Sequence, residues 1–117
     1  MVNKLIYLVT GAMIILAVSC IHLKAQKVFS VDYASQADIK VFVVSYESQA
    51  DLLVYKVKYE SRAGKNDGRW FFTRYSSQAD KKIFFVEYQS QADLKIHFVD
   101  YESRAGWRNR SKMPLMY

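Results

Sequence analysis

The sequence predicts an all-β fold built from six short strands, and three observations lead to that prediction. A seven-residue motif close to "SYESQAD" occurs six times in the chain of 117 residues. A run rich in β-branched and aromatic residues, about as long as a strand, precedes each copy. The copies recur about every 13 residues, which indicates a repeated structural unit, because a catalytic motif is usually needed only once. The motif tyrosines are Tyr33, Tyr46, Tyr59, Tyr75, Tyr88 and Tyr101.

The runs before the tyrosines, such as "IKVFVVSY", predict strands that are covered on both faces. We number positions backwards from the tyrosine, so that position −2 is the second residue before it. Position −2 holds valine or threonine and position −4 an aromatic residue or His97, and we expect both to share one face with the tyrosine. Position −5, on the opposite face, is also apolar in every copy. Such strands must cross over one another or belong to tightly packed sheets.

The residues after each tyrosine predict a turn. We expect the serine two residues on to bond nearby backbone groups, and the alanine two residues later to fill a slot too small for a larger side chain. The next residue is aspartate in four copies and glycine in two. Both tolerate turn backbones, including positive φ, and aspartate adds a local hydrogen bond, so the interchange predicts a structural joint. These turn residues are Asp38, Asp51, Gly64, Asp80, Asp93 and Gly106.

The period of the modules predicts one domain with an internal duplication. The third module of each triplet ends in "SRAG" instead of "SQAD", so three modules form a unit that recurs after 42 residues. We therefore expect a single β-repeat domain over residues 26–117 with pseudo-two-fold symmetry. Its first half is 27–64, its linker 65–68, its second half 69–110 and its basic, irregular tail 111–117.

The N-terminal residues 1–25 predict a signal peptide. A short basic start, "MVNK", precedes the uncharged apolar run 5–21, and "LKA" resembles a signal peptidase site. Two alternatives stay open: an uncleaved membrane anchor, since the run is close to the length of a span, and a lipoprotein anchored at Cys20, since "AVSC" loosely resembles a bacterial lipobox. We expect an exported protein that is periplasmic, on the outer surface or secreted.

After export, the mature domain would depend on its hydrophobic core alone for stability. Cys20 is the only cysteine, so the mature domain would have no disulfide, no thiolate nucleophile and no cysteine metal ligand. The chain is 51% hydrophobic and 15% aromatic, which is enough for a core. Its net charge of +6 comes from interspersed acids and bases, as on a mixed solvated surface.

Three features together resemble a known family. They are the alternating "SQAD" strands, the central "GKNDGRWFFTRYSSQADKKIFFVEY" and the terminal "YESRAGWRNRSKMPLMY". This combination, over residues 27–117, is similar to a bacterial family of unknown function with a deep seven-crossing (septoil) torus knot. The resemblance implies an all-β, pseudo-two-fold domain whose halves are threaded through each other, and it implies no activity. Knotted connections are very rare, so composition and periodicity alone would not predict one.

The sequence predicts no catalytic site. His97 is the only histidine after residue 25, so a nucleophilic triad would have to use it, with Ser103 and Asp100 as conceivable partners. It occupies a slot that holds an aromatic residue in the other modules, which favours a half-buried packing role. Glu47, Glu60 and Glu102 occupy equivalent positions, whereas paired catalytic carboxylates need two different environments. We therefore expect a non-enzymatic protein.

We also expect no metal and no cofactor. The turn aspartates could offer oxygens to calcium, but one carboxylate per turn is too few unless several turns converge. Zinc is less favoured still, because the domain has a single histidine and no cysteine.

The C-terminal region predicts the one candidate ligand site. A cluster of basic residues around a tryptophan would suit an anionic envelope glycan or lipid headgroup, whereas nucleic acid is not expected for an exported protein. The cluster comprises Arg104, Trp107, Arg108, Arg110 and Lys112.

Two functions follow from these expectations. The first is a structural protein of the cell envelope or exterior, monomeric and selected for resistance to unfolding. The alternative is a module that binds an anionic glycan or lipid through the C-terminal cluster. The sequence names no ligand.

Overall fold

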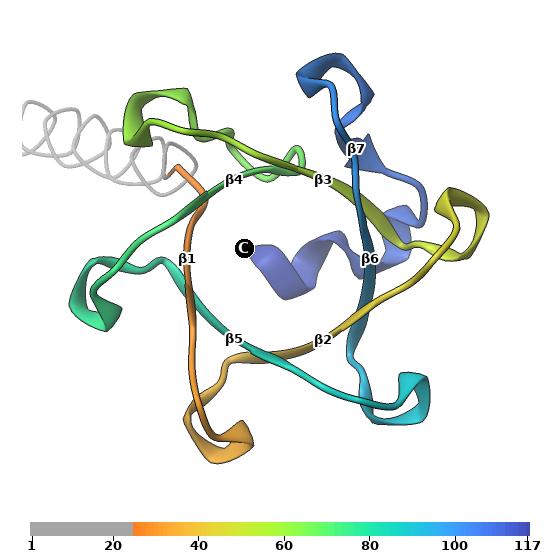
Figure 1. The fold of residues 1–117 in the computed structure, drawn as a ribbon, viewed down its shortest axis with the longest axis horizontal. Helices are drawn as coiled ribbons and strands as arrows, with labels where there is room; N and C mark the ends of the chain where they lie inside the picture. Colours follow the sequence, from red (N-terminus) through yellow and green to blue (C-terminus); the bar gives the residue numbers. More distant parts are fainter. Residues whose placement is uncertain (1–24) are drawn as a thin grey trace, which may run out of the picture.

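The computed structural model describes residues 25–117, so the predicted signal peptide, its anchor alternative and Cys20 lie outside the described residues, apart from Ala25. In the described part of the chain, no helix has the length and hydropathy needed to cross a membrane. Six strands form a ring, with turns projecting from its outside (Figure 1). The strands are β1 (Lys27–Ser30), β2 (Ile39–Val43), β3 (Leu52–Lys56), β4 (Arg69–Phe72), β5 (Lys81–Phe85) and β6 (Leu94–Phe98).

The ring is a closed parallel barrel, and this confirms the expected strand-rich, all-β fold. Its strands follow the order β4-β1-β5-β2-β6-β3, and a further β4–β3 pairing closes it. All six barrel pairings are parallel, and each joins one of β1–β3 to one of β4–β6. A short strand, β7 (Gly106–Trp107), adds to β3 in antiparallel fashion. Closure into one barrel thus covers the inner face of each strand without a second stacked sheet, and the side chains at position −4 on the outer face are half-buried.

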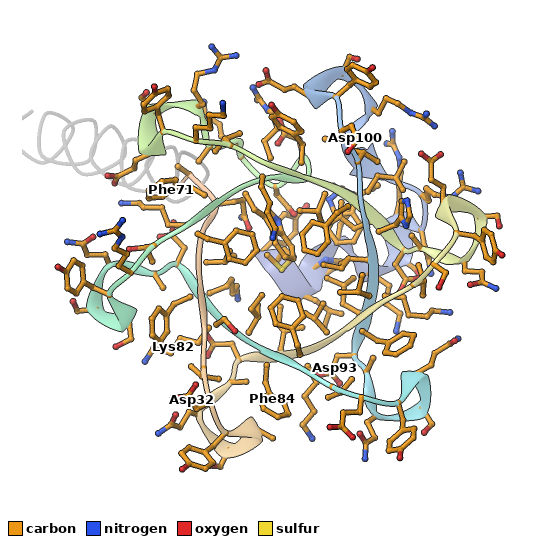
Figure 2. All side chains as sticks on the ribbon, in the orientation of Figure 1. Asp32, Phe71, Lys82, Phe84, Asp93 and Asp100 are labelled. Atoms are coloured by element: carbon orange, nitrogen blue, oxygen red, sulfur yellow. The ribbon has the colours of Figure 1, made fainter. Side chains whose placement is uncertain are left out.

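The inner face of the barrel is the core. Alternate residues of a strand point to the same side, and position −5 is fully buried in all six strands, with position −7 buried beside it wherever it is aliphatic. Side chains fill the middle of the ring (Figure 2). The buried inner residues are Val28, Ile39, Val41, Leu52, Val54, Trp70, Ile83, Leu94 and Ile96.

The motif tyrosines lie outside the strands, so the expectation that they share a buried strand face is wrong. Each strand ends at position −3, and the tyrosine in extended backbone immediately precedes a one-turn 3-10 helix. Position −2 remains buried or half-buried, but the tyrosines are 63–69% exposed. The six helices are η1 (Ala34–Gln36), η2 (Glu47–Gln49), η3 (Glu60–Arg62), η4 (Ser76–Gln78), η5 (Gln89–Gln91) and η6 (Glu102–Arg104).

The C-terminal tail closes one mouth of the barrel. We expected it to be irregular, but it forms a 3-10 helix, η7 (Arg110–Met116), whose end lies over the centre of the ring (Figure 1). Met116 is 1% exposed and belongs to the barrel core. The Gln26 side chain donates to the Met116 carbonyl at 2.9 Å, and the Asn66 side chain donates to the Met113 carbonyl at 3.2 Å. Both partners precede a strand, so the sealed mouth is the one where strands begin.

Candidate functional site

The turn rim, which we define as the six motif tyrosines with η1–η6, is the repeated surface of the molecule. In every turn the tyrosine carbonyl accepts a hydrogen bond from the backbone N–H three residues on, at 3.0 or 3.1 Å. The N–H of the alanine closes a second bond of the same kind at 3.1–3.2 Å. These two bonds define a single 3-10 turn. Backbone hydrogen bonding therefore fixes each turn and leaves the side chains of the motif free to face outward.

The turn aspartates bind the neighbouring strand and not their own turn. Each donates its N–H to a lysine carbonyl at 2.7–2.8 Å, and its carboxylate accepts the N–H of that same lysine at 2.8–3.1 Å. None has a positive φ, so the expected local hydrogen bond and left-handed turn are wrong. The carboxylate acts as a clamp between strands distant in the chain. The pairs are Asp38 with Lys82, Asp51 with Lys95, Asp80 with Lys27, and Asp93 with Lys40.

Gly64 takes the place of an aspartate because another carboxylate already occupies that space. A Cβ on Gly64 would lie 1.7 Å from Oδ1 of Asp67. That oxygen accepts, at 3.2 Å, the backbone N–H of Arg69, which stands at position −6, the position of the lysines that the aspartates clamp in four other strands. The left-handed conformations lie nearby, at Asn66 (φ 73°) and Gly68 (φ 89°). A side chain on Gly68 would also meet the Leu53 carbonyl at 2.3 Å, so the linker requires glycine there.

An ion-pair network joins three of the six turns. Arg104 of η6 pairs with Glu47 of η2, and Glu102 of η6 pairs with Arg62 of η3 at 2.8 Å. Glu102 also meets Arg69 at 3.2 Å, and hydrogen bonds from Arg69 and then Arg62 lower the pKa of Glu102 from its ordinary value of 4.5. These groups are largely exposed, so the network contributes little to stability.

The network extends to the start of two strands. The Glu60 carboxylate accepts from Lys27 at 2.8 Å and raises the pKa of that lysine. Hydrogen bonds to Asp67 first, and then to Glu102, raise the pKa of Arg69. The cations are therefore already neutralised by carboxylates of the same chain.

His97 makes a packing contact in the described structure. It is half-buried on β6, and its Nδ1 lies 2.9 Å from the Val44 carbonyl, which accepts a hydrogen bond from the Nδ1–H tautomer. It has no hydrogen bond to Ser103 or Asp100 within residues 25–117. In the same range, no three His, Cys, Asp or Glu side chains are close enough to hold a metal ion. The triad considered from the sequence is therefore not assembled.

The structure does not bring the C-terminal cluster together as a ligand site. The Trp107 indole N–H donates to the Asn66 carbonyl at 2.9 Å, and the ring packs against the barrel core. Arg104 is occupied by Glu47 on a different turn. Arg108 and Arg110 are exposed on the tail. Half-buried Lys112 lines an open groove of about 540 Å³. Lys95, Asp51 and Asp93 line the same groove, so its charges balance and offer no net attraction to an anion.

Most of the chain matches the model of a known protein family. The family model of the 7(1) septoil knot domain matches residues 25–108. The chain belongs to the septoil knot domain family. This confirms the resemblance found in the sequence. No curated protein and no solved structure matches the chain.

In this septoil knot domain, the grooves lie between the turns and the clamped strand ends. One groove of about 360 Å³ is lined by Asp67, Arg69, Glu102 and the Ser103–Ala105 side of η6. Another of about 750 Å³ is lined by Lys27, Glu60, Asp80 and the η3 turn. Both are crossed by ion pairs. They are open, internally neutralised clefts, so neither has the enclosed form of a small-molecule site.

Sequence reasoning missed the exposure of the tyrosines. Their recurrence was visible, but recurrence alone does not separate a buried anchor from a displayed side chain. The signal that could have separated them is the polar residue at position −1 followed by the polar turn, since such flanks place a residue at the water-facing end of a strand.

Proposed function

We propose that this septoil knot domain is a non-enzymatic, exported structural protein whose duplicated, knotted chain is selected for slow unfolding. The observation that carries the proposal is the strand order: β1, β2 and β3 each lie between two of β4, β5 and β6. No barrel pairing joins two strands of the same half. Neither half can therefore complete its backbone hydrogen bonds without the other.

Interleaving of this kind supports kinetic stability. Five of the six barrel pairings connect residues 44 or 53 apart in the chain, and β3–β4 joins residues 14 apart. Loss of one of the long-range pairings does not release a local unit, and such pairings slow folding. We expect unfolding to be slow as well, because both halves must separate together. The four aspartate clamps add reciprocal bonds between the two halves. A threaded chain adds a further barrier, because its ends must be withdrawn before the halves separate.

Protease digestion of the native chain at moderate temperature tests the proposal. We expect the region 27–106 to stay intact for hours, because cleavage needs an opened state that forms slowly. Cleavage within this region in minutes would contradict slow unfolding.

A second experiment isolates the topology. A specific protease site inserted between Lys65, which is exposed, and Asn66 allows the linker to be cut after folding. The cut protein keeps its strands and contacts but consists of two chains that cannot form a knot. We expect it to unfold in denaturant faster than the uncut insertion variant, which is the matched control. Equal unfolding rates of the cut and uncut proteins would show that the knotted topology is not the cause of slow unfolding.

A further inference from the structure

The tyrosines of the turn rim are kept in all six modules although the fold does not bury them. Inner positions vary between copies; position −5, for example, is valine, tryptophan or isoleucine. The tyrosine never varies, yet it is 63–69% exposed in every copy. Packing explains an invariant residue when it is buried, as Ala50 is in its turn. It does not explain an invariant side chain in water.

The backbone does not require a tyrosine either. The residue lies in extended backbone, with φ between −130° and −121°, and its carbonyl is the group that the turn uses. Threonine, valine or phenylalanine would suit that conformation equally well. Within residues 25–117 no motif tyrosine hydroxyl has a hydrogen-bond partner in the protein. The phenol therefore serves something outside the chain.

Each tyrosine has the same polar neighbours. The serine two residues on is exposed in all six turns, and its hydroxyl makes no side-chain hydrogen bond in the described structure, contrary to the expectation of local backbone bonding. In η1, η2 and η5 an exposed glutamine follows, and it too makes no side-chain hydrogen bond. An aromatic face beside a free hydroxyl and a free amide forms a polar-aromatic contact unit that is repeated around the rim (Figure 1).

The charges of the rim favour an uncharged ligand. Arg62 and Arg104, the cations of the turns themselves, are paired with Glu102 and Glu47. The six residues that immediately precede the tyrosines include both acidic and basic side chains. Two of the acidic ones, Asp32 and Asp100, are labelled in Figure 2. Neither sign dominates, so an anionic or cationic partner gains little from long-range attraction.

We infer that the turn rim binds a neutral polysaccharide through its six tyrosines. Sugar rings present C–H faces that stack on aromatic rings and hydroxyls that pair with serine and glutamine side chains. A single exposed tyrosine binds weakly, but the turns project outward around the ring (Figure 1), so tyrosines of neighbouring turns contact successive units of one polymer chain and avidity multiplies their effect. This surface shares only Arg104 with the C-terminal cluster, and the proposed binding does not depend on the rate of unfolding.

The test is retention of the native chain on insoluble cellulose, chitin and β-1,3-glucan. We expect at least one of these polymers to retain the protein, and about 0.5 M salt to leave retention unchanged because charges are not involved. Replacing all six motif tyrosines by alanine should lower the apparent affinity roughly 100-fold. Replacing them by phenylalanine should cause a smaller loss, because the stacking face remains and only the contacts of the phenol hydroxyl are removed.

Tyr117→Ala is the matched control. Tyr117 is 75% exposed but lies outside the turns, so its loss should not change retention. Circular dichroism and the thermal midpoint establish that each variant is folded. If the sixfold alanine variant does not fold, Tyr33→Ala, Tyr75→Ala and Tyr88→Ala combined should lower affinity roughly tenfold. No retention on any of the polymers, retention that salt abolishes, or equal retention of native and alanine variants would overturn the inference.

Discussion

The first three barrel strands and the last three supply opposite sides of every strand pairing in the barrel. At position −5, β1–β3 carry valine, and each valine is in register with a phenylalanine at position −3 of the other group. These pairs are Val28 with Phe72, Val41 with Phe85, and Val54 with Phe98. At the same position β4–β6 carry larger residues, and each faces a residue without an aromatic ring. These pairs are Trp70 with Lys56, Ile83 with Ser30, and Ile96 with Val43.

The difference teaches that the two halves are complementary and not interchangeable. At three interfaces a buried valine lies beside a half-buried phenylalanine that packs against the core, whereas at the other three a larger buried residue lies beside an exposed residue at the end of its strand. Lys56 is one of these exposed residues, and it holds its ammonium over Phe98 and Phe72, at 4.5 and 5.1 Å from the ring centroids.

The largest expected effect on stability comes from truncating the largest inner side chain. Trp70 is 1% exposed and the largest residue of the core. Trp70→Ala should lower the free energy of unfolding by about 3–5 kcal/mol through the cavity it leaves. Denaturant titration measures the loss. Tyr75→Ala, which truncates an exposed aromatic residue of the next turn, is the control and should change it by less than about 0.5 kcal/mol. Comparable losses in both variants would mean that the inner pairing is not the core.

A swap across one interface sharpens the comparison. Val41→Phe places two phenylalanines in register and should cost about 1–3 kcal/mol by overpacking. Phe85→Val alone should also destabilise, by leaving a void. The double variant should recover part of both losses, with a coupling energy of about 0.5–3 kcal/mol in denaturant unfolding. Additive losses would show that large and small residues are not paired across β2 and β5.

The clamps offer a smaller test of how the halves depend on each other. Asp51 is 6% exposed, accepts the Lys95 N–H at 2.9 Å and also accepts from the Asn109 side chain at 3.2 Å. Asp51→Ala leaves a strand N–H unpaired and should cost about 1–3 kcal/mol. Asp93→Ala is the matched control at an exposed clamp, where water can replace the carboxylate, so its loss should be smaller. A larger loss of stability in Asp93→Ala than in Asp51→Ala would show that burial does not set the size of the effect.

The smallest expected effect is on pH. The pKa of Glu102 is lowered in the folded protein by Arg69 and Arg62, so its contribution is present above 4.5 and is lost as pH falls through the depressed folded value. Acidification from neutral pH to below 4.5 should therefore lower the thermal midpoint, with about one degree or less due to this exposed residue. Glu102→Gln should remove that part of the pH dependence. An unchanged profile in Glu102→Gln would assign the dependence to other carboxylates.

Much of the fold could be predicted because its signals are local. The strands are visible as β-branched and aromatic runs, and apolar residues at both positions −4 and −5 indicate that both faces are covered, as the burial of Val41 and the half-burial of Phe42 show. The partners of Asp38 and Asp80 could not be predicted, because they lie 44 and 53 residues away and nothing in the motif encodes which strand end will be adjacent.

The candidate site was harder to predict. Composition placed Trp107 in a basic cluster, but its indole N–H is directed to the linker at Asn66, a contact set by the path of β7 beside β3. A run of charges in sequence says nothing about which of them a distant carboxylate will neutralise, and Glu47 neutralises Arg104 from another turn.

The sequence by itself determined the six strands, the turns that end them, their period and the family, because these depend on side-chain alternation and on contacts within a module. Only the tertiary structure decided that the strands of the two halves alternate around one barrel, that valine meets phenylalanine at three of the six interfaces and that the tyrosines face solvent. The physical reason is that these outcomes depend on which strand becomes the neighbour of which, and a repeat whose modules are nearly alike in sequence offers every strand several equivalent partners.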